Sequence, residues 1–270
     1  VSLSVERATS PLQFLFRRAI RIWPLYALAT IIIFAINQSE WRKLDHLIYS
    51  LLFLQVPGAP KSMPTHPLGW SLFYEVAFYL MLAASMLWRT PRPIGERVLC
   101  IFAVTLCLGS MVKFQQPLNI YGNPIIVEFA LGIWMGIIWK KTPILPQWIV
   151  RGLFFLGVVF LVRSIYFGFD LISEAEYTLN SLYSWERVKI WGIPSAMIVA
   201  SAVFRPQAPS KNSVSVFLGD ASYSIYLFSL PALWAFDLIW PLFDGISVDI
   251  IIIFATLVAS LVGILFYWVF

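Results

Sequence analysis

Residues 250–270 read "IIIIFATLVASLVGILFYWVF", a run of 21 residues without a single charged side chain. An α-helix of about 20 apolar residues crosses the hydrocarbon core of a bilayer. The run is apolar on every face, whereas a strand of a transmembrane β-barrel alternates between apolar and polar residues. This stretch therefore predicts a membrane-spanning helix and excludes a barrel strand.

The rest of the chain has the same character. Of its 270 residues, 60% are hydrophobic and only 12% are charged, against about 25% charged residues in an average soluble domain. We expect one all-α integral membrane domain over residues 1–270, a polytopic bundle of about eight spans. The predicted spans are 22–37, 68–88, 98–112, 124–139, 148–166, 190–204, 214–236 and 248–270. The apolar segment 46–56 is too short to cross and is expected to be interfacial or re-entrant.

The distribution of charge gives the orientation of these spans. If the segment before the first span is cytoplasmic, alternation places twelve Lys and Arg residues on the cytoplasmic side and seven on the other. Cytoplasmic loops are enriched in Lys and Arg. The sequence pI near 9.2 therefore follows from topology, and we expect the bilayer as a partner and no nucleic acid.

Two acidic residues fall inside predicted spans. Ser71, Glu75 and Tyr79 follow at four-residue spacing and share one helix face. A carboxylate at bilayer depth is costly and usually faces a cavity or a partner. This stripe is interpreted as the lining of a substrate cavity, with a helix-to-helix hydrogen bond or a wet interfacial carboxylate as the alternative.

The second intramembrane acid, Glu128, shares a helix face with Gly132 and Gly136. Small residues at four-residue spacing allow another backbone to come close. Close helix packing is the favoured interpretation here, and room for an acyl chain or another substrate is the alternative.

Three other groups of polar residues can be explained by spacing alone without a role in catalysis or binding. The cluster Arg17, Arg18 and Arg21 suits phosphate oxygens, yet a topology anchor or a contact with anionic lipid is the simpler interpretation. Asp220 fits a helix N-cap. His46 and His66 fall in a predicted outer loop, where we expect them to be solvated, and no metal-ligand spacing is present.

Four segments together resemble the membrane-bound acyltransferase 3 family. They are "RRAIRIWPLY" at 17–26, "GWSLFYEVAFYL" at 69–80, "NPIIVEFALGIWMG" at 123–136 and "LGDASYSIYL" at 218–227. They occur in the family's order and extend over nearly the whole chain. Val76 and Ala77, where other members have Glu and Gln, resemble the branch that modifies exopolysaccharides.

The resemblance implies a ten-span O-acyltransferase in the cell inner membrane, of which this chain carries eight spans and is truncated at both ends. The donor would be cytoplasmic acyl-CoA, with acetyl-CoA as the expected form, and no bound cofactor or metal. The acceptor would be a sugar hydroxyl of a polysaccharide or glycolipid. Arg18 and Arg21 would bind the CoA donor. Glu75 and Glu128 would be the catalytic acids. The remaining site positions, expected to bind substrate, are Trp70, Tyr79 and Asp220.

Two features depart from the family pattern. The histidine that the family places in its first span is absent from this sequence, and Ser229 stands where the late span often has a histidine. The sequence therefore names no general base. A transporter or flippase for a glycan or lipid, and an inactive scaffold of the same family, remain alternatives.

Overall fold

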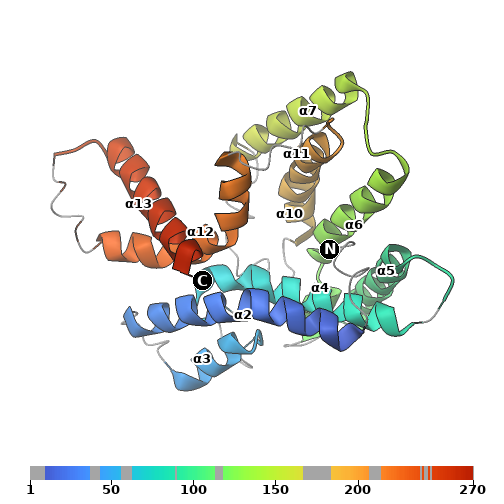
Figure 1. Cartoon of the computed structure of the whole chain (residues 1–270), viewed down its shortest axis with the longest axis horizontal. Coiled ribbons are helices and arrows are strands. Elements are labelled where there is room, and N and C mark those ends of the chain that lie inside the picture. Colours follow the sequence, from blue (N-terminus) through green and yellow to red (C-terminus); the bar gives the residue numbers. More distant parts are fainter. Residues whose placement is uncertain are drawn as a thin grey trace. The chain divides into compact units, whose positions relative to one another are not determined.

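The computed structural model describes residues 10–36, 43–55, 63–88, 90–112, 118–166, 184–206, 214–237, 239, 243 and 245–269. Within these ranges the chain forms helices and turns and no strand (Figure 1). The longer helices are α2 (Pro11–Ile36), α4 (Trp70–Leu87), α5 (Ile94–Val112), α6 (Ile126–Lys141), α7 (Gln147–Tyr166), α11 (Ile193–Val203), α12 (Val214–Asp237) and α13 (Val248–Val269). The shorter ones are α3 (Leu44–Leu51), η1 (Pro67–Gly69), η2 (Leu118–Gly122), α10 (Ser184–Arg187) and the π-helical η3 (Val188–Gly192).

The described helices have the lengths that a polytopic membrane protein needs. Six of them are long and apolar enough to cross a bilayer, namely 11–36, 67–87, 94–112, 147–166, 214–236 and 248–269. The other two predicted spans are also helical but shorter, α6 with 16 residues and α11 with 11 residues preceded by α10 and η3. Several large aliphatic side chains of α13 are exposed: Ile250, Ile252, Ile253, Leu257, Leu261 and Leu265. The all-α membrane fold expected from the sequence is confirmed.

The chain divides into two compact units. The first comprises residues 1–18, 55–63 and 70–207, and the second comprises residues 19–54, 64–69 and 208–270. Helix α2 contributes its first turns to the first unit and its remainder to the second. The segment 46–56, expected to be too short to cross, contains most of the eight-residue helix α3 in the second unit.

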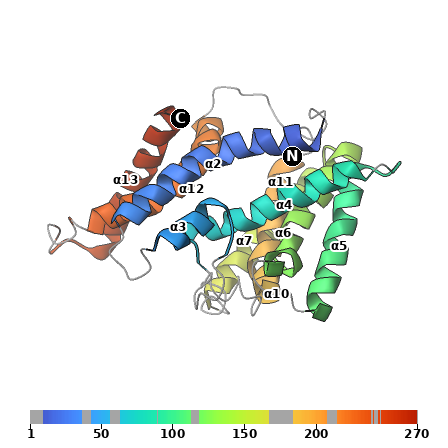
Figure 2. The ribbon, with the colours of Figure 1, turned by 90° about the horizontal axis from the view of Figure 1, so that it is seen from below.

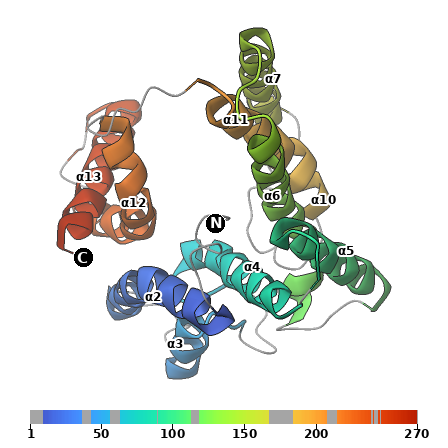
Figure 3. The same cartoon turned by 45° about the vertical axis from the view of Figure 1, so that its right-hand side comes forward.

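The core of the first unit forms around α4. Tyr74 and Ala77 of α4 pack with Ile120 and Ile125, which flank the turn leading into α6. Farther along the chain, α7 and α11 pack against each other, as Figures 2 and 3 show. This unit holds both acids that the sequence places inside spans.

The second unit is built on the hairpin of α12 and α13 (Figure 1). Ser224 Oγ donates a hydrogen bond of 2.6 Å to the carbonyl oxygen of Gly263, on the facing helix. A Cβ atom at Gly263 would collide with the backbone of Ile225, so the close approach of the two helices requires glycine there. The small residue is thus a condition of the packing.

The turn before α4 is fastened to this second unit. Tyr226 donates its hydroxyl to the carbonyl oxygen of Leu68 at 2.6 Å. A Cβ atom at Gly69 would lie 2.8 Å from the ring of Tyr26, and Tyr26 in turn donates its hydroxyl to the Ser50 carbonyl of α3 at 3.1 Å. These contacts fix the residues just before the first turn of α4.

Candidate active site

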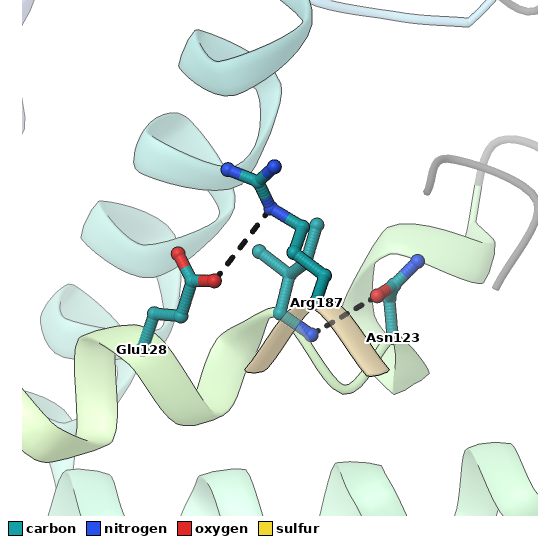
Figure 4. A network of polar contacts seen from close by, with 4 residues as sticks. Asn123, Glu128 and Arg187 are labelled. Carbon is teal, nitrogen blue, oxygen red and sulfur yellow. Dashed lines mark hydrogen bonds and ion pairs between the residues drawn. The ribbon is translucent and has the colours of Figure 1, made fainter. Parts of the chain in front are cut away.

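Glu128 lies in the first turn of α6, directly after a tight turn. The side-chain oxygen of Asn123 accepts a hydrogen bond of 3.0 Å from the backbone N–H of Ile125, which holds this turn (Figure 4). Carboxylates are favoured in the first turn of a helix because its backbone N–H groups carry partial positive charge. The local sequence therefore fixes the position of Glu128 at the start of α6.

The partner of this carboxylate is Arg187, at the end of α10. Its Nε lies 3.6 Å from Oε1 of Glu128, and the two side chains are only 18% and 29% exposed, respectively (Figure 4). Breaking a poorly solvated ion pair by removing one partner is costly, because the other charge stays behind without compensation. Each residue therefore holds the other in place.

Two indole rings also contact Arg187. Its guanidinium carbon lies 5.1 Å from the ring centroid of Trp70 and 5.0 Å from that of Trp191, both within the range of a cation–π interaction. Trp191 is oriented by a hydrogen bond of 3.2 Å from its Nε1 to Ser164 Oγ. Because Arg187 and Trp191 are four residues apart at the entry to a π-helix, they lie on one side of the chain. Single π-helical turns are frequent at functional sites.

The pair faces a cavity of about 460 Å³. Its walls are mostly apolar, with Ser195 adding a hydroxyl group. A Cβ atom at Gly192 would lie 3.0 Å from Cγ and 3.1 Å from Oε1 of Glu128. Glycine at this position thus leaves the space that the carboxylate occupies.

The expectation of close packing at Gly132 and Gly136 is wrong. A Cβ atom at either position would meet no atom of the described chain within 4 Å. The small residue that lets a neighbour approach Glu128 is Gly192, on a segment far away in the sequence. The periodicity of α6 alone carries no information about that segment.

A second polar cluster forms farther along α4, toward its C-terminus. Tyr79 donates a hydrogen bond of 2.5 Å from its hydroxyl to Oε1 of Glu75, so the predicted shared face of these residues is confirmed. The guanidinium carbon of Arg18 lies 5.2 Å from the Tyr79 ring centroid and 5.5 Å from that of Phe14. The structure therefore brings together three predicted site residues, Arg18, Glu75 and Tyr79.

Helix α4 connects the two clusters. Trp70, at its first residue, contacts Arg187, and Tyr79, nine residues later, contacts Arg18. Nine residues at 1.5 Å each correspond to about 14 Å along the helix axis. Both clusters thus contact the same helix, at two levels along its axis.

The two remaining predicted site residues belong to the second unit. Arg21 is exposed on α2, which begins at Pro11 and therefore carries all three arginines of the cluster. Asp220 is exposed as well, but it is not an N-cap: α12 begins at Val214, so Asp220 lies in its second turn. The start at Val214 agrees with the predicted span 214–236, so the N-cap interpretation of Asp220 was wrong although the span itself was placed correctly.

The expectation that both histidines are solvated is also wrong. His66 is fully buried and its Nε2 lies 2.9 Å from the carbonyl oxygen of Leu227. Because a carbonyl oxygen only accepts, Nε2 is the protonated nitrogen. Burial lowers the pKa of His66, and it also lowers the pKa of His46, which is 8% exposed and whose Nδ1 lies 3.4 Å from Thr65 Oγ1.

Ser229 and the acidic side chains complete the inventory of reactive groups. Ser229 Oγ donates to the carbonyl oxygen of Tyr226 at 2.9 Å, a bond within its own helix. Over the described ranges, no three His, Cys, Asp or Glu side chains lie close enough together to hold a metal ion.

Arg187 is the candidate site residue that sequence reasoning missed. The alternation of predicted spans places it only among the seven cations of the outer side. The sequence signal is its four-residue spacing to Trp191, which lies at the start of the predicted span 190–204. This spacing places a cation and an indole on one face. Its partner Glu128 lies 59 positions earlier, and no periodicity connects the two.

These features define a polytopic membrane protein with an arginine–carboxylate pair at a cavity lined by α6, η3 and α11. Residues 4–268 match the acyltransferase domain family, acyltransferase 3, and the chain belongs to that family. It is 29% identical over 237 residues to the exopolysaccharide production protein ExoZ of Rhizobium meliloti (strain 1021), covering 83% of this chain and 69% of that protein. No solved structure matches the chain.

Proposed function

We propose that this protein is an inner-membrane O-acyltransferase that moves an acetyl group from cytoplasmic acetyl-CoA to a sugar hydroxyl of an exopolysaccharide or glycolipid. Membership of the acyltransferase family and the similarity to a protein of exopolysaccharide production support the class of reaction and of acceptor. The observation that carries the proposal is the pair of clusters on α4, about 14 Å apart along the helix. One suits an anionic donor and the other a neutral, hydroxyl-bearing acceptor.

The donor end is the Arg18 cluster. The charge distribution predicts that the start of α2 faces the cytoplasm, where acyl-CoA is found. Guanidinium groups form charge-assisted hydrogen bonds with phosphate oxygens, and CoA carries several phosphates. Arg18, packed on Phe14 and Tyr79, would bind them together with the exposed Arg21.

The acceptor end is the Glu128–Arg187 cavity. The predicted topology places the starts of α4, α6 and α10 toward the outer face, where exported glycans are found. The Glu128 carboxylate would accept a hydrogen bond from the attacking sugar hydroxyl, and Trp191 would cover an apolar sugar face. Asp220, near the start of α12 in the second unit, remains a proposed substrate-binding residue, and the predicted topology places it toward the cytoplasmic side instead.

The reaction balances without a cofactor or metal. The sugar oxygen forms a bond to the thioester carbonyl carbon, the carbon–sulfur bond breaks, and the hydroxyl proton leaves for CoA as its thiol. Glu128 and Glu75 would orient the reacting groups, because each is already held by a donor or a cation.

Acyl transfer in membrane vesicles tests the proposal. Labelled acetyl-CoA is supplied on the cytoplasmic side to vesicles containing the full protein. We expect Arg18→Ala/Arg21→Ala to raise the KM for acetyl-CoA at least about tenfold, because each lost charge-assisted hydrogen bond contributes more than 1 kcal/mol. Glu128→Gln should lower kcat about 100-fold through misplacement of the acceptor, with the KM for acetyl-CoA unchanged.

Glu96→Gln is the matched control, since Glu96 is an exposed acid in the first turn of α5. Transfer at the wild-type rate by Glu128→Gln, in a protein that is inserted and stable, would remove the carboxylate from the reaction. Unchanged glycan acylation in a deletion strain would instead favour a transporter or scaffold.

A further inference from the structure

A second cavity, of about 530 Å³, opens between α7 and α11 in the first unit. The two helices run antiparallel and approach closely at Gly157, where a Cβ atom would lie 2.8 Å from the Pro194 carbonyl oxygen. The cavity lies nearer the start of α7, lined from Gln147 to Phe154 on α7 and from Ile198 to Pro206 at the end of α11. It shares no lining residue with the Glu128 cavity.

Two arginines lie at the mouth of this second cavity. Arg151 comes from the first turns of α7, and Arg205 follows the end of α11. A backbone hydrogen bond of 3.1 Å from Leu145 N–H to the Phe204 carbonyl oxygen fixes the two chain segments beside each other. Both guanidinium groups are exposed, and the described residues place no carboxylate in an ion pair with either.

The surroundings are positively charged and interfacial. From Lys140 to Arg151 the sequence has three basic residues and no acidic one. Trp148, in the first turn of α7, is 75% exposed, and exposed tryptophan is enriched at the boundary between membrane and water. The predicted orientation places this boundary on the cytoplasmic side, whose lipids are anionic.

Apart from Gln147 and Ser201, the remainder of the wall is apolar. Val150 and Phe154 on α7 and Ile198 and Ala202 on α11 contribute to it, and Phe154 is 54% exposed. An apolar wall does not stabilise a free phosphate, whereas it stabilises a bound acyl chain. The combination of two guanidinium groups above an apolar groove matches a phosphate attached to a hydrocarbon chain.

We propose that this cavity binds one anionic phospholipid of the cytoplasmic leaflet, with its phosphate between Arg151 and Arg205 and an acyl chain along Phe154. The bound lipid would fill the cavity that the two helices line. This binding is independent of acyl transfer, so the experiment below uses no activity measurement.

Native mass spectrometry of the full protein, released from phosphatidylcholine nanodiscs containing phosphatidylglycerol, tests the proposal. We expect one phosphatidylglycerol to remain bound to wild type and Arg151→Gln/Arg205→Gln to weaken its binding about 30-fold, since each basic residue near an anionic lipid contributes about fivefold. Lys140→Gln/Lys141→Gln is the matched control. It removes two charges from the same side but none from the cavity wall, and retention should equal that of wild type.

A second variant tests the apolar part. Ala202→Phe fills the cavity and keeps both arginines, and we expect it to lose the lipid. Equal loss in the lysine control, or full retention by Ala202→Phe, would show attraction by surface charge alone and would overturn the proposal. Displacement of the lipid by millimolar inorganic phosphate, with no preference for phosphatidylglycerol, would overturn it in favour of a free-anion site.

Discussion

His66 satisfies a carbonyl group that its own helix cannot satisfy. In an α-helix the carbonyl of residue 227 accepts from the N–H of residue 231. Residue 231 is Pro, inside α12, and proline has no N–H. Leu227 is fully buried, so water cannot replace the missing donor, and His66 Nε2–H occupies its place at 2.9 Å.

His66→Ala should therefore destabilise the protein by two separate terms. Loss of the ring leaves a cavity, and loss of the donor leaves a buried carbonyl unsatisfied, which costs about 1–3 kcal/mol. In a Pro231→Ala background the new backbone N–H can satisfy Leu227, and only the cavity term remains. The double-mutant cycle should give a coupling of about 1–3 kcal/mol, because the cavity term cancels.

Unfolding in mixed micelles, titrated with SDS and followed by tryptophan fluorescence, measures the four free energies. His66→Gln is the matched variant, since its amide can still donate to Leu227, and it should keep most of the stability. An additive cycle, with coupling below about 0.5 kcal/mol, would refute the argument that His66 replaces the donor that Pro231 lacks.

Three further predictions concern His66 and single glycines. Burial lowers the pKa of His66 in the folded state, so below about pH 6.5 the unfolded chain binds more protons than the folded one. The free energy of unfolding should therefore fall as the pH drops below this value, by up to about 1.4 kcal/mol per pH unit. His66→Gln should show a shallower slope in the same SDS titration. Gly192→Ala should lower acyl transfer in vesicles, because its methyl group would lie 3.0–3.1 Å from Cγ and Oε1 of Glu128. Gly132→Ala, which has open space around it, should not lower it. Equal rates for the two variants would contradict the cavity geometry. Gly263→Ala should cost about 1–3 kcal/mol by overpacking the α12–α13 hairpin, and Gly219→Ala, with nothing near, should be neutral or stabilising.

Much of the site could be read locally. Glu75 and Tyr79 lie four residues apart, so helix geometry alone places them together, and the structure confirms it. Glu128 stood out because a carboxylate in an apolar span needs a partner. The identity of that partner, Arg187, was beyond reach, because contacts between helices depend on packing that no local period encodes.

The burial of the two histidines also could not be predicted from the local sequence. Loop residues are usually exposed, and nothing near His66 in the sequence indicates burial. Its place follows from Pro231, 165 positions later, which leaves a carbonyl for it to satisfy.

The sequence by itself determined that this is an all-helical membrane protein, because a bilayer tolerates only apolar side chains and a backbone that satisfies its own hydrogen bonds. It also determined the acyltransferase family, through short motifs that each lie within one helix or at its start. Only the tertiary structure decided which groups meet: Glu128 with Arg187, Arg18 with Tyr79, His66 with Leu227. The reason is that hydropathy and helical period act over a few residues, whereas partners are chosen by the packing of segments far apart in the chain.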